Sequence, residues 1–486
     1  MVSLLSSLKV ITLSIYIIIP FVFALIFGAF SIMKNPIHLR RLGITFASIQ
    51  FAFASLIYLV MPKVTFSILN LSFGYSRFSS TLLFLLSLII LIISIISKTF
   101  ILRSHRAFWS VLFLIFALSN SIILSENILL NILNIVWIIF LNYFLSITFS
   151  SSTESKENIN SELKLDISVI GISTALILFD FVRYFVLNEI EFSFLNISQN
   201  LNHIHPTSTI IAFFGFLILI FKLFDFIPFA SKRIANSANV NPLVDYLNTI
   251  TRYIIGSFIL FKTGIIFAYL YWDFKEIILC YLGFILLYYL ILSFRGDSIY
   301  KFLNSIMVVC FSLNMFSIFA FTERGLASFM YSIVATITSF SLLYFTLAII
   351  SNKFKTDNFD EFKKISPKSY SVIFFIMFSI LNFIGVPMFS MFSSRLYILT
   401  SLFSADYSNW ALSFIQCLSI IAYLVIAVIS LRIFHAILIA PVNTQKNNFE
   451  ISKHQILTLS ILSFSILIIG LFSNSAVNNL FFNIIT

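Results

Sequence analysis

Apolar stretches of about twenty residues follow one another along this chain, and they constrain its fold more strongly than any motif. A helix needs ~20 apolar residues to cross a bilayer, and about fourteen stretches of that length can be placed. Their centres lie near Ile19, Ala52, Leu88, Ile115, Ile138, Ala175, Phe216, Ile255, Ile285, Val309, Ile337, Ser379, Leu424 and Phe464. The sequence therefore predicts an all-α polytopic protein embedded in a lipid bilayer.

The composition excludes a soluble domain. Hydrophobic residues make up 60% of the chain and charged residues only 10%, whereas ~25% of a typical soluble domain is charged. Cys280, Cys310 and Cys417 lie far apart within apolar segments, so neither a disulfide nor a zinc site is expected. No nicotinamide, flavin, iron–sulfur or haem motif is present, and we expect no cofactor, no metal and no catalytic residue.

The distribution of Lys and Arg predicts the orientation in the membrane. Loops after odd-numbered stretches carry most of the basic residues, namely Lys34, Arg40, Arg41, Lys98, Arg103, Arg106, Lys232, Arg233 and the lysine-rich segment 352–369. Loops after even-numbered stretches carry Glu126, Glu189, Glu191 and Asp406. The positive-inside rule then places the odd loops on the cytoplasmic or matrix side and both termini on the other side. The loop 150–166 and the loop that holds Lys63 and Arg77 run against this trend.

The expected location is a bacterial cytoplasmic (inner) membrane or a mitochondrial inner membrane. The formal net charge of +11 is mostly a topology signal, because no basic stripe lies on a soluble domain, and no nucleic-acid partner is expected. The first stretch is too long for the core of a signal peptide and predicts a helix.

Three segments are expected outside the bilayer. "VTFSILNLSFGY" (64–75) is rich in β-branched and aromatic residues around a glycine, which predicts a short extramembrane hairpin. The polar segments 150–166 and 352–369 are interpreted as loops that are too short to form domains.

The seventh stretch, "FFGFLILIFKLFDFIPFASKR", carries charges and a proline inside an apolar helix. Lys222 lies deep in it, Asp225 follows one turn later, and Pro228 comes a turn after that. A proline kinks a helix and frees a backbone carbonyl, which is tolerated at membrane depth only where protein or water satisfies it. The stretch predicts a helix break at Pro228 beside a buried cation.

The twelfth stretch repeats this pattern in the second half of the chain. Gly385 and Pro387 interrupt it, and Arg395 follows. A charge at the bilayer centre costs at least ~2.5 to 3.5 kcal/mol, so Arg395 is expected to face protein or water. Proline breaks in both halves favour a repeat-built transporter with its ion path at the breaks. The alternative is that the prolines only end helices.

The eighth stretch places polar residues on one helix face. Asp245, Asn248 and Arg252 are spaced i, i+3, i+7, and Lys262 lies almost three turns beyond Arg252. Groups spaced in this way can hold a file of water through the bilayer.

The sixth stretch contributes one further pair of charges. In "LILFDFVRYF", Asp180 and Arg183 are i, i+3 neighbours, and such neighbours interact on a helix surface. A structural ion pair is the favoured interpretation.

Three segments together resemble one known family. The family's seventh-helix lysine, proline–aromatic break and eighth-helix start are similar to the segment "FKLFDFIPFASKRIANSANVNPLVDYLNTITR". Its Asp-x-Lys-Arg-Leu-Leu-Ala-Tyr-Ser-Ser segment is similar to "DSIYKFLNSIMVVCFSLNMF", with Lys301 on the lysine. "SPKSYSVIFFIMFSILNFIGVPMFSMFSSRLYIL" is similar to its Gly-Leu-Pro break and twelfth-helix lysine. The chain thus resembles, over roughly residues 70–440, the antiporter-like membrane subunits of respiratory complex I (subunits L, M and N, closest to N) and of Mrp-type cation/proton antiporters.

This resemblance implies a fold and a set of roles. The fold would have two inverted five-helix repeats with broken helices 7 and 12, and the domains would be 1–105 (three helices and the hairpin), 106–270 (first repeat), 271–440 (second repeat) and 441–486 (last helix). Lys222 would be the switching cation of the first half-channel, Arg252 and Lys262 would line a central polar axis, and Arg395 would end the path.

The chain departs from the family at several of these positions. The fifth helix, "NILNIVWIIFLNYFL", lacks the family's glutamate, and Ala230 stands where the family has a histidine. Two transfer lysines are replaced by Arg252 and Arg395, and an arginine keeps its proton where a buried lysine can release it. The acid expected to replace the missing glutamate beside Lys222 is Asp225, with Asp180 as second choice.

Three functions follow as hypotheses. The first is a proton-translocating membrane subunit of a complex I-like NADH–quinone oxidoreductase, with no redox centre of its own and with partly or wholly lost pumping. The second is a subunit of an Mrp-type monovalent cation/proton antiporter, and the third is a non-conducting structural subunit. The expected partners are other membrane subunits, and the first hypothesis leaves open an indirect link to a quinone-reducing module.

Overall fold

The computed structural model describes residues 2–29, 36–60, 64–68, 71–101, 105–150, 153–179, 193–194, 196–197, 206–228, 241–295, 298–354, 356–358, 370–405, 409–435 and 451–478. The first helices are α1 (Val2–Ala29), α2 (Pro36–Val60), α3 (Arg77–Phe100), α4 (His105–Leu124), α5 (Ile128–Thr148), α6 (Thr153–Leu178), α9 (Pro206–Leu223) and α11 (Pro242–Ile266). The later helices are α12 (Ala268–Asp273), α13 (Lys275–Arg295), α14 (Ile299–Ile318), α15 (Glu323–Phe354), α17 (Tyr370–Ile384), α18 (Ser390–Phe403), α19 (Trp410–Phe434) and α20 (Lys453–Leu471).

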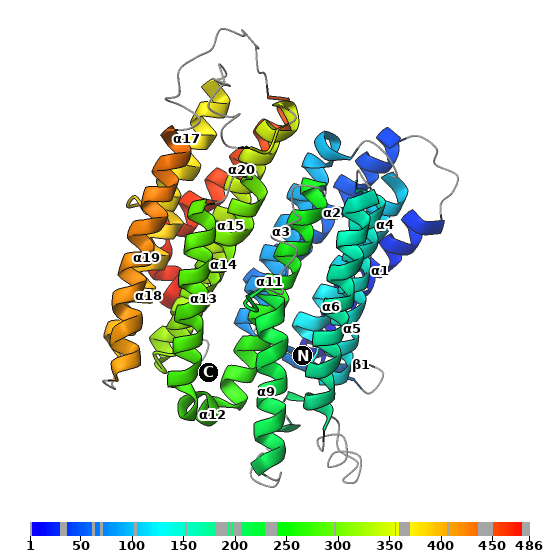
Figure 1. The fold of residues 1–486 in the computed structure, drawn as a ribbon. Coiled ribbons are helices and arrows are strands. Elements are labelled where there is room, and N and C mark those ends of the chain that lie inside the picture. The colour runs from blue at the N-terminus through cyan, green and yellow to red at the C-terminus, as the bar shows by residue number, and fades with distance from the viewer. Residues whose placement is uncertain are drawn as a thin grey trace. The chain divides into compact units, whose positions relative to one another are not determined.

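Each centre of an apolar stretch lies within one of these helices (Figure 1). Among the described helices, ten are long and apolar enough to cross a membrane by length and composition, and shorter apolar segments lie in α1, α9 and α17. The predicted all-α class is confirmed, and the chain is a multi-pass membrane protein.

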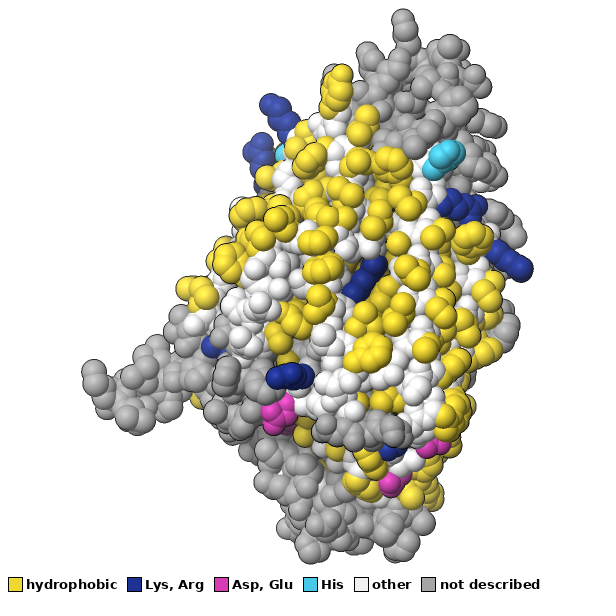
Figure 2. Space-filling model, turned by 90° about the vertical axis from the view of Figure 1, so that its left-hand side faces the viewer, with side chains coloured by type: hydrophobic (Ala, Val, Ile, Leu, Met, Phe, Trp, Pro, Cys, Tyr) yellow, Lys and Arg dark blue, Asp and Glu magenta, His cyan; other side chains and the backbone are white. Residues whose placement is uncertain are grey.

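The outer surface is apolar, as a bilayer requires. Leu25, Leu59, Ile277 and Leu424 are all more than 60% exposed. On the face in Figure 2, hydrophobic side chains spread over the middle, and most of the visible charged side chains lie towards the ends. Inside the helices, serine and threonine hydroxyls donate to carbonyls of the preceding turn, as Ser94 Oγ does to the Ile90 carbonyl at 2.7 Å, which satisfies them without polar partners from other helices.

The described chain forms two compact units. The first comprises Met1–Phe224 and Leu243–Leu270, and the second comprises Asp225–Pro242 and Tyr271–Thr486. In the first, α1 packs against α4, α2 against α3 and α6 against α9; in the second, α13 packs against α14 and α19, and α15 against α14, α18 and α20. The finer predicted divisions at residues 105 and 440 stay predictions.

The hairpin expected at 64–75 is present. Strands β1 (Val64–Ile68) and β2 (Leu71–Tyr75) pair antiparallel, with Val64 opposite Tyr75. Helix α3 begins directly afterwards, because Ser76 caps it by accepting a hydrogen bond from the Ser79 N–H at 3.1 Å.

The interpretation of 150–166 as a loop is wrong. Helix α6 begins at Thr153 and runs unbroken to Leu178, so most of this polar segment is the first half of a helix. The misreading came from its polar composition. Its buried face nevertheless follows a helical period, in Ile159, Asp166, Ile170 and Ser173.

The backbone is non-helical at both expected proline breaks. Helix α9 ends at Leu223, and the chain reaches Pro228 without helical structure. Helix α17 ends at Ile384 and α18 begins at Ser390, so that Gly385 and Pro387 lie between two helices.

Candidate functional site

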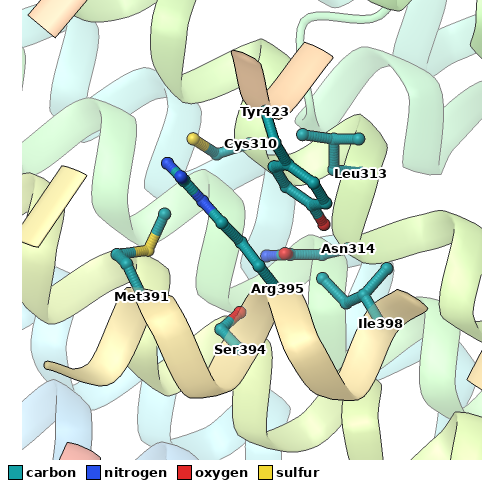
Figure 3. A pocket seen from close by; sticks show the side chains of 8 residues that line it. All are labelled: Cys310, Leu313, Asn314, Met391, Ser394, Arg395, Ile398 and Tyr423. Carbon is teal, nitrogen blue, oxygen red and sulfur yellow. The ribbon is translucent and has the colours of Figure 1, made fainter. Parts of the chain in front are cut away.

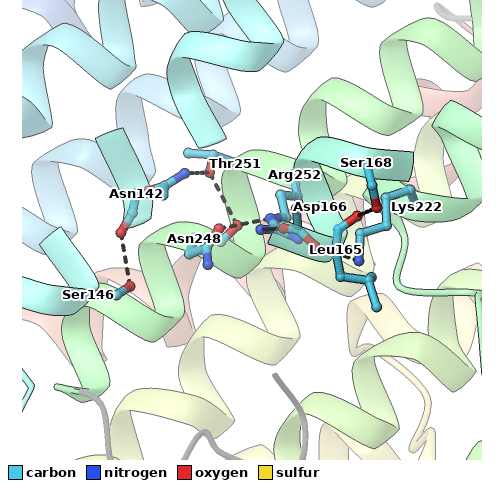
Figure 4. Close-up of polar contacts among 9 residues, drawn as sticks. All are labelled: Asn142, Ser146, Leu165, Asp166, Ser168, Lys222, Asn248, Thr251 and Arg252. Carbon is cyan, nitrogen blue, oxygen red and sulfur yellow. Dashed lines mark hydrogen bonds and ion pairs between the residues drawn. The ribbon is translucent and has the colours of Figure 1, made fainter. Parts of the chain in front are cut away.

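A buried ion triad joins α6, α9 and α11 within the first unit (Figure 4). The Asp166 carboxylate of α6 binds Lys222 Nζ of α9 at 2.6 Å through one oxygen and Arg252 Nη2 of α11 at 2.5 Å through the other. Arg252 Nε also donates to Asn248 Oδ1 at 2.9 Å. The three charged side chains are no more than 5% exposed. One acid is therefore shared by two cations.

Close packing of α6 against α9 brings Lys222 within reach of Asp166. Gly215 of α9 lies so near α6 that a Cβ on it would meet the Ile177 nitrogen and the Ser173 oxygen at 2.9 Å. The helix axes approach closely there because glycine has no side chain to hold them apart. Lys222 lies two turns further along α9 and its side chain crosses to α6.

The triad continues into a chain of neutral polar groups that ends on α5. Thr251 Oγ1 donates to the Leu247 carbonyl at 2.8 Å, lies 3.3 Å from the Asn248 carbonyl oxygen, and accepts from Asn142 Nδ2 at 3.4 Å. Asn142 is fully buried, and its Oδ1 has no hydrogen-bond partner among the described groups. A buried amide oxygen of this kind is a hydrogen-bonding position for a water molecule. The chain of contacts thus runs from α9 through α6 and α11 to α5.

The formal charges of the three triad residues do not balance. Two cations and one anion leave a formal excess of one positive charge in a buried site. Burying charge is costly unless each charge is paired.

At the second break, Arg395 binds the end of α17. Gly385 has a left-handed φ of 86°, and the Val386 and Gly385 N–H groups donate to the Leu381 and Asn382 carbonyls at 3.1 and 3.0 Å. This is the Schellman arrangement that ends many helices.

The Schellman arrangement at the end of α17 leaves two carbonyls of the last turn without helical donors, and the Arg395 guanidinium donates to both of them. Nη1 binds the Ile384 oxygen at 2.7 Å, and Nη2 binds the Phe383 oxygen. Arg395 is 8% exposed, and in the described chain its partners are backbone carbonyls and the Tyr423 ring rather than an acid.

At the first break, tyrosine hydroxyls satisfy the freed carbonyls. Tyr253 donates to the Phe224 carbonyl at 3.3 Å. Tyr289 donates to the Asp225 carbonyl at 2.9 Å, and Tyr281 donates to the Phe226 carbonyl at 2.8 Å. Asp225 itself has a left-handed φ of 53°, which aspartate tolerates better than most residues. Non-helical backbone in this apolar setting is therefore held by protein groups, as a membrane span requires.

The remaining predicted site residues are spread over several places. Lys262 pairs with Glu126 at 2.5 Å in a site where the two side chains are 18% and 11% exposed, outside the triad. Asp245 is buried in the first turn of α11, where a carboxylate suits the helix dipole. Lys301 is exposed in the first turn of α14 and lies in no buried cluster. Asp180 and Arg183 lie outside the described residues.

Sequence reasoning missed Asp166 and Asn142. The nominated partners of Lys222 were Asp225 and Asp180, and the structure instead pairs Lys222 with Asp166. The helical period of Ile159, Asp166 and Ile170 is the signal that places this acid on a buried face. The signal for Asn142 is that Asn131, Asn134 and Asn142 recur at helical spacing in the apolar helix α5, and all three are buried. Within the described ranges, no three His, Cys, Asp or Glu side chains come together as metal ligands.

Comparison with known proteins identifies the fold. The sequence matches no protein-family model and no curated protein. The structure is similar to a chain of respiratory complex I from Thermus thermophilus with bound NADH, with a TM-score of 0.81, 13% identity, and coverage of 96% of this chain and 98% of that one.

Two further complexes contain similar chains. A chain of the membrane-bound sulfane sulfur reductase, an archaeal respiratory membrane complex, matches with a TM-score of 0.80, 13% identity and coverage of 97% and 96%. A chain of the Mrp complex from Dietzia sp. DQ12-45-1b matches with a TM-score of 0.78, 13% identity and coverage of 97% of this chain and 52% of that one. The predicted resemblance is confirmed at the level of the fold: this chain has the fold of the antiporter-like membrane subunits of complex I and Mrp complexes.

Proposed function

We propose that this chain is a proton-translocating membrane subunit of a complex I-like respiratory complex, with Lys222 as its switching group. The observation that carries the proposal is that Lys222 and Arg252 share one buried carboxylate, Asp166. Asp166 takes the place of the acid that the fifth helix lacks. No redox centre in this chain is required, and the driving reaction belongs to partner subunits.

The shared carboxylate supplies the two states that a proton switch needs. With Asp166 close to Lys222, the ammonium is paired and holds its proton. When Asp166 is engaged by Arg252 alone, Lys222 becomes an unpaired buried cation, which is unfavourable, and its proton is released. Asn248, Thr251 and Asn142 then offer hydrogen-bonding positions towards α5. Moving one charge against 100 mV requires about 2.3 kcal/mol, which the partner reaction must supply.

The fold supports membership in a multi-subunit membrane complex. All three similar chains come from such complexes, and two of these are described as respiratory. This is why the complex I-like assignment comes first and the Mrp-type antiporter second. The expected partners are other membrane subunits in either case.

A second candidate function is a non-conducting structural subunit. The observation that favours it is the role of Arg395, whose guanidinium closes the end of α17 through two backbone carbonyls. A group held in this way, and unable to release its proton, stabilises the helix break without conducting. On this account the triad likewise only joins α6, α9 and α11, and no part of the chain translocates protons.

The test is Lys222→Met in the assembled complex, with Lys262→Met as the matched control. Both substitutions remove an ammonium from a lysine–carboxylate pair of nearly equal length. Proton translocation per partner turnover should fall with Lys222→Met and stay close to the wild-type value with Lys262→Met. Unchanged translocation in a normally assembled Lys222→Met complex favours the structural function instead.

A further inference from the structure

A small cavity lies beside Arg395 in the second unit (Figure 3). It is lined by Cys310, Leu313, Asn314, Met391, Ser394, Arg395, Ile398 and Tyr423. It has room for roughly one water-sized particle. We infer that this Arg395 cavity is a binding site for one small monovalent anion of the halide class, with chloride as the occupant.

Two hydrogen-bond donors at the cavity have no acceptor among the described residues. Both terminal nitrogens of Arg395 are used by the Ile384 and Phe383 carbonyls, while its Nε has no partner. The Tyr423 hydroxyl also has none. Both side chains are at least nine-tenths buried, so bulk water does not satisfy them. A buried donor without an acceptor costs about 1 to 3 kcal/mol, and more when the group is charged.

The charge of Arg395 is only partly compensated by the protein. The carboxyl end of α17, to which it donates, carries about half a negative charge. The Tyr423 ring, whose centroid lies 5.1 Å from the guanidinium carbon, adds a weaker attraction. None of the eight lining residues is an aspartate or glutamate. Roughly half of a positive charge is left uncompensated, so the cavity attracts an anion.

An anion fits these donors better than a water molecule does. A water molecule can accept from Nε and from the Tyr423 hydroxyl, but it carries no charge and must find acceptors for its own two protons. A halide ion only accepts hydrogen bonds, is nearly spherical and is only slightly larger than water. Polyatomic anions such as sulfate are too large for a cavity of this size. The site does not depend on whether the chain translocates protons.

Thermal unfolding of the detergent-purified full chain, or of its complex, tests this inference. Chloride is replaced by gluconate at constant ionic strength, and the apparent Tm should fall. Bromide should restore it, whereas sulfate should not. Tyr423→Phe keeps the ring and removes one donor. It should raise, about tenfold, the chloride concentration that gives half of the increase in Tm. Arg395→Gln should abolish the dependence on halide.

Arg40→Gln is the matched control, because Arg40 Nη2 also binds a backbone carbonyl, that of Ile95 at 3.1 Å, but does not line the cavity. It should keep the halide dependence. Anomalous diffraction at the bromine edge, from bromide-soaked crystals, should give a peak between Arg395 and Tyr423. No halide dependence in the wild-type chain together with no anomalous peak would show that water alone occupies the cavity, and would overturn the inference.

Discussion

At the scale of single residues, Asp166 decides how the charged core of the first unit is organised. It lies on α6, is 2% exposed, and is the carboxylate to which both Lys222 and Arg252 are joined. Removing one partner of a buried ion pair leaves an uncompensated charge, which costs more than the pair itself contributes. Removing Asp166 affects two cations at once.

Asp166→Asn should therefore destabilise the fold strongly, by about 3 to 5 kcal/mol. Glu126→Gln is the control, because it breaks a single pair with Lys262 that is more exposed than the triad, so its loss should cost less than the loss of Asp166. Detergent-based unfolding of the purified chain measures both. Adding Lys222→Met to Asp166→Asn should recover part of the loss. If Asp166→Asn and Glu126→Gln lower the unfolding free energy equally, the triad is accessible to solvent, and the prediction is wrong.

At the scale of helices, arginine side chains donate to backbone carbonyls near the ends of neighbouring helices. Arg77 Nη1 donates to the Tyr58 carbonyl at 2.7 Å, Arg40 Nη2 donates to the Ile95 carbonyl at 3.1 Å, and Arg395 binds the last turn of α17. In an apolar chain with few acids, backbone carbonyls near helix ends are suitable partners for a guanidinium.

The break after α17 depends on the left-handed conformation of Gly385. Gly385→Ala should destabilise the chain by about 1 to 2 kcal/mol, since an L-residue pays that cost in the left-handed region. The added Cβ would also meet Arg395 Nη1 at 2.9 Å. Gly264→Ala is the control, because this glycine lies in α11 with nothing within 4 Å of the new methyl group. Thermal unfolding of both variants checks the prediction. A Gly385→Ala chain that is as stable as the wild type would contradict it.

The contact between α6 and α9 depends on Gly215, which has no side chain to hold the two helices apart. Gly215→Ala should separate the two helices and cost about 1 kcal/mol or more, as overpacking does. It should also weaken the ion pair between Lys222 and Asp166. Gly171→Ala on α6, where a Cβ meets nothing within 4 Å, is the control. Unfolding experiments on the two variants measure the difference, and equal stability of the two would contradict close packing at Gly215.

At the scale of the whole molecule, the fold was easier to predict than the site. Twenty-residue apolar stretches and proline positions depend on local sequence, so the helices and the ends of α9 and α17 could be foreseen. The triad depends on which faces of α6, α9 and α11 meet in space. The polar start of α6 hid Asp166, and proximity in sequence favoured Asp225 over a partner from another helix. The exposed position of Lys301 shows the same limit, because a motif match does not fix burial.

The fold also predicts how the protein behaves as a whole. Purification in mild detergent should recover this chain with other membrane subunits, because the similar chains all belong to multi-subunit complexes. Mass spectrometry of the bound partners distinguishes the two complexes. Redox subunits indicate a complex I-like assembly, and small antiporter partners indicate an Mrp-type one. Recovery of a single stable chain with no partner would contradict both.

We propose that proton translocation depends on Asp166, the carboxylate that Lys222 and Arg252 share. The most direct test of this proposal is the number of protons moved per partner turnover in membrane vesicles that contain the complex with Asp166→Asn, measured beside the wild type and Glu126→Gln. The account predicts that the ratio falls sharply for Asp166→Asn, because Lys222 loses the counter-charge that lets it switch, and that Glu126→Gln keeps the wild-type ratio. An Asp166→Asn complex that assembles, turns over and moves protons at the wild-type ratio would contradict it.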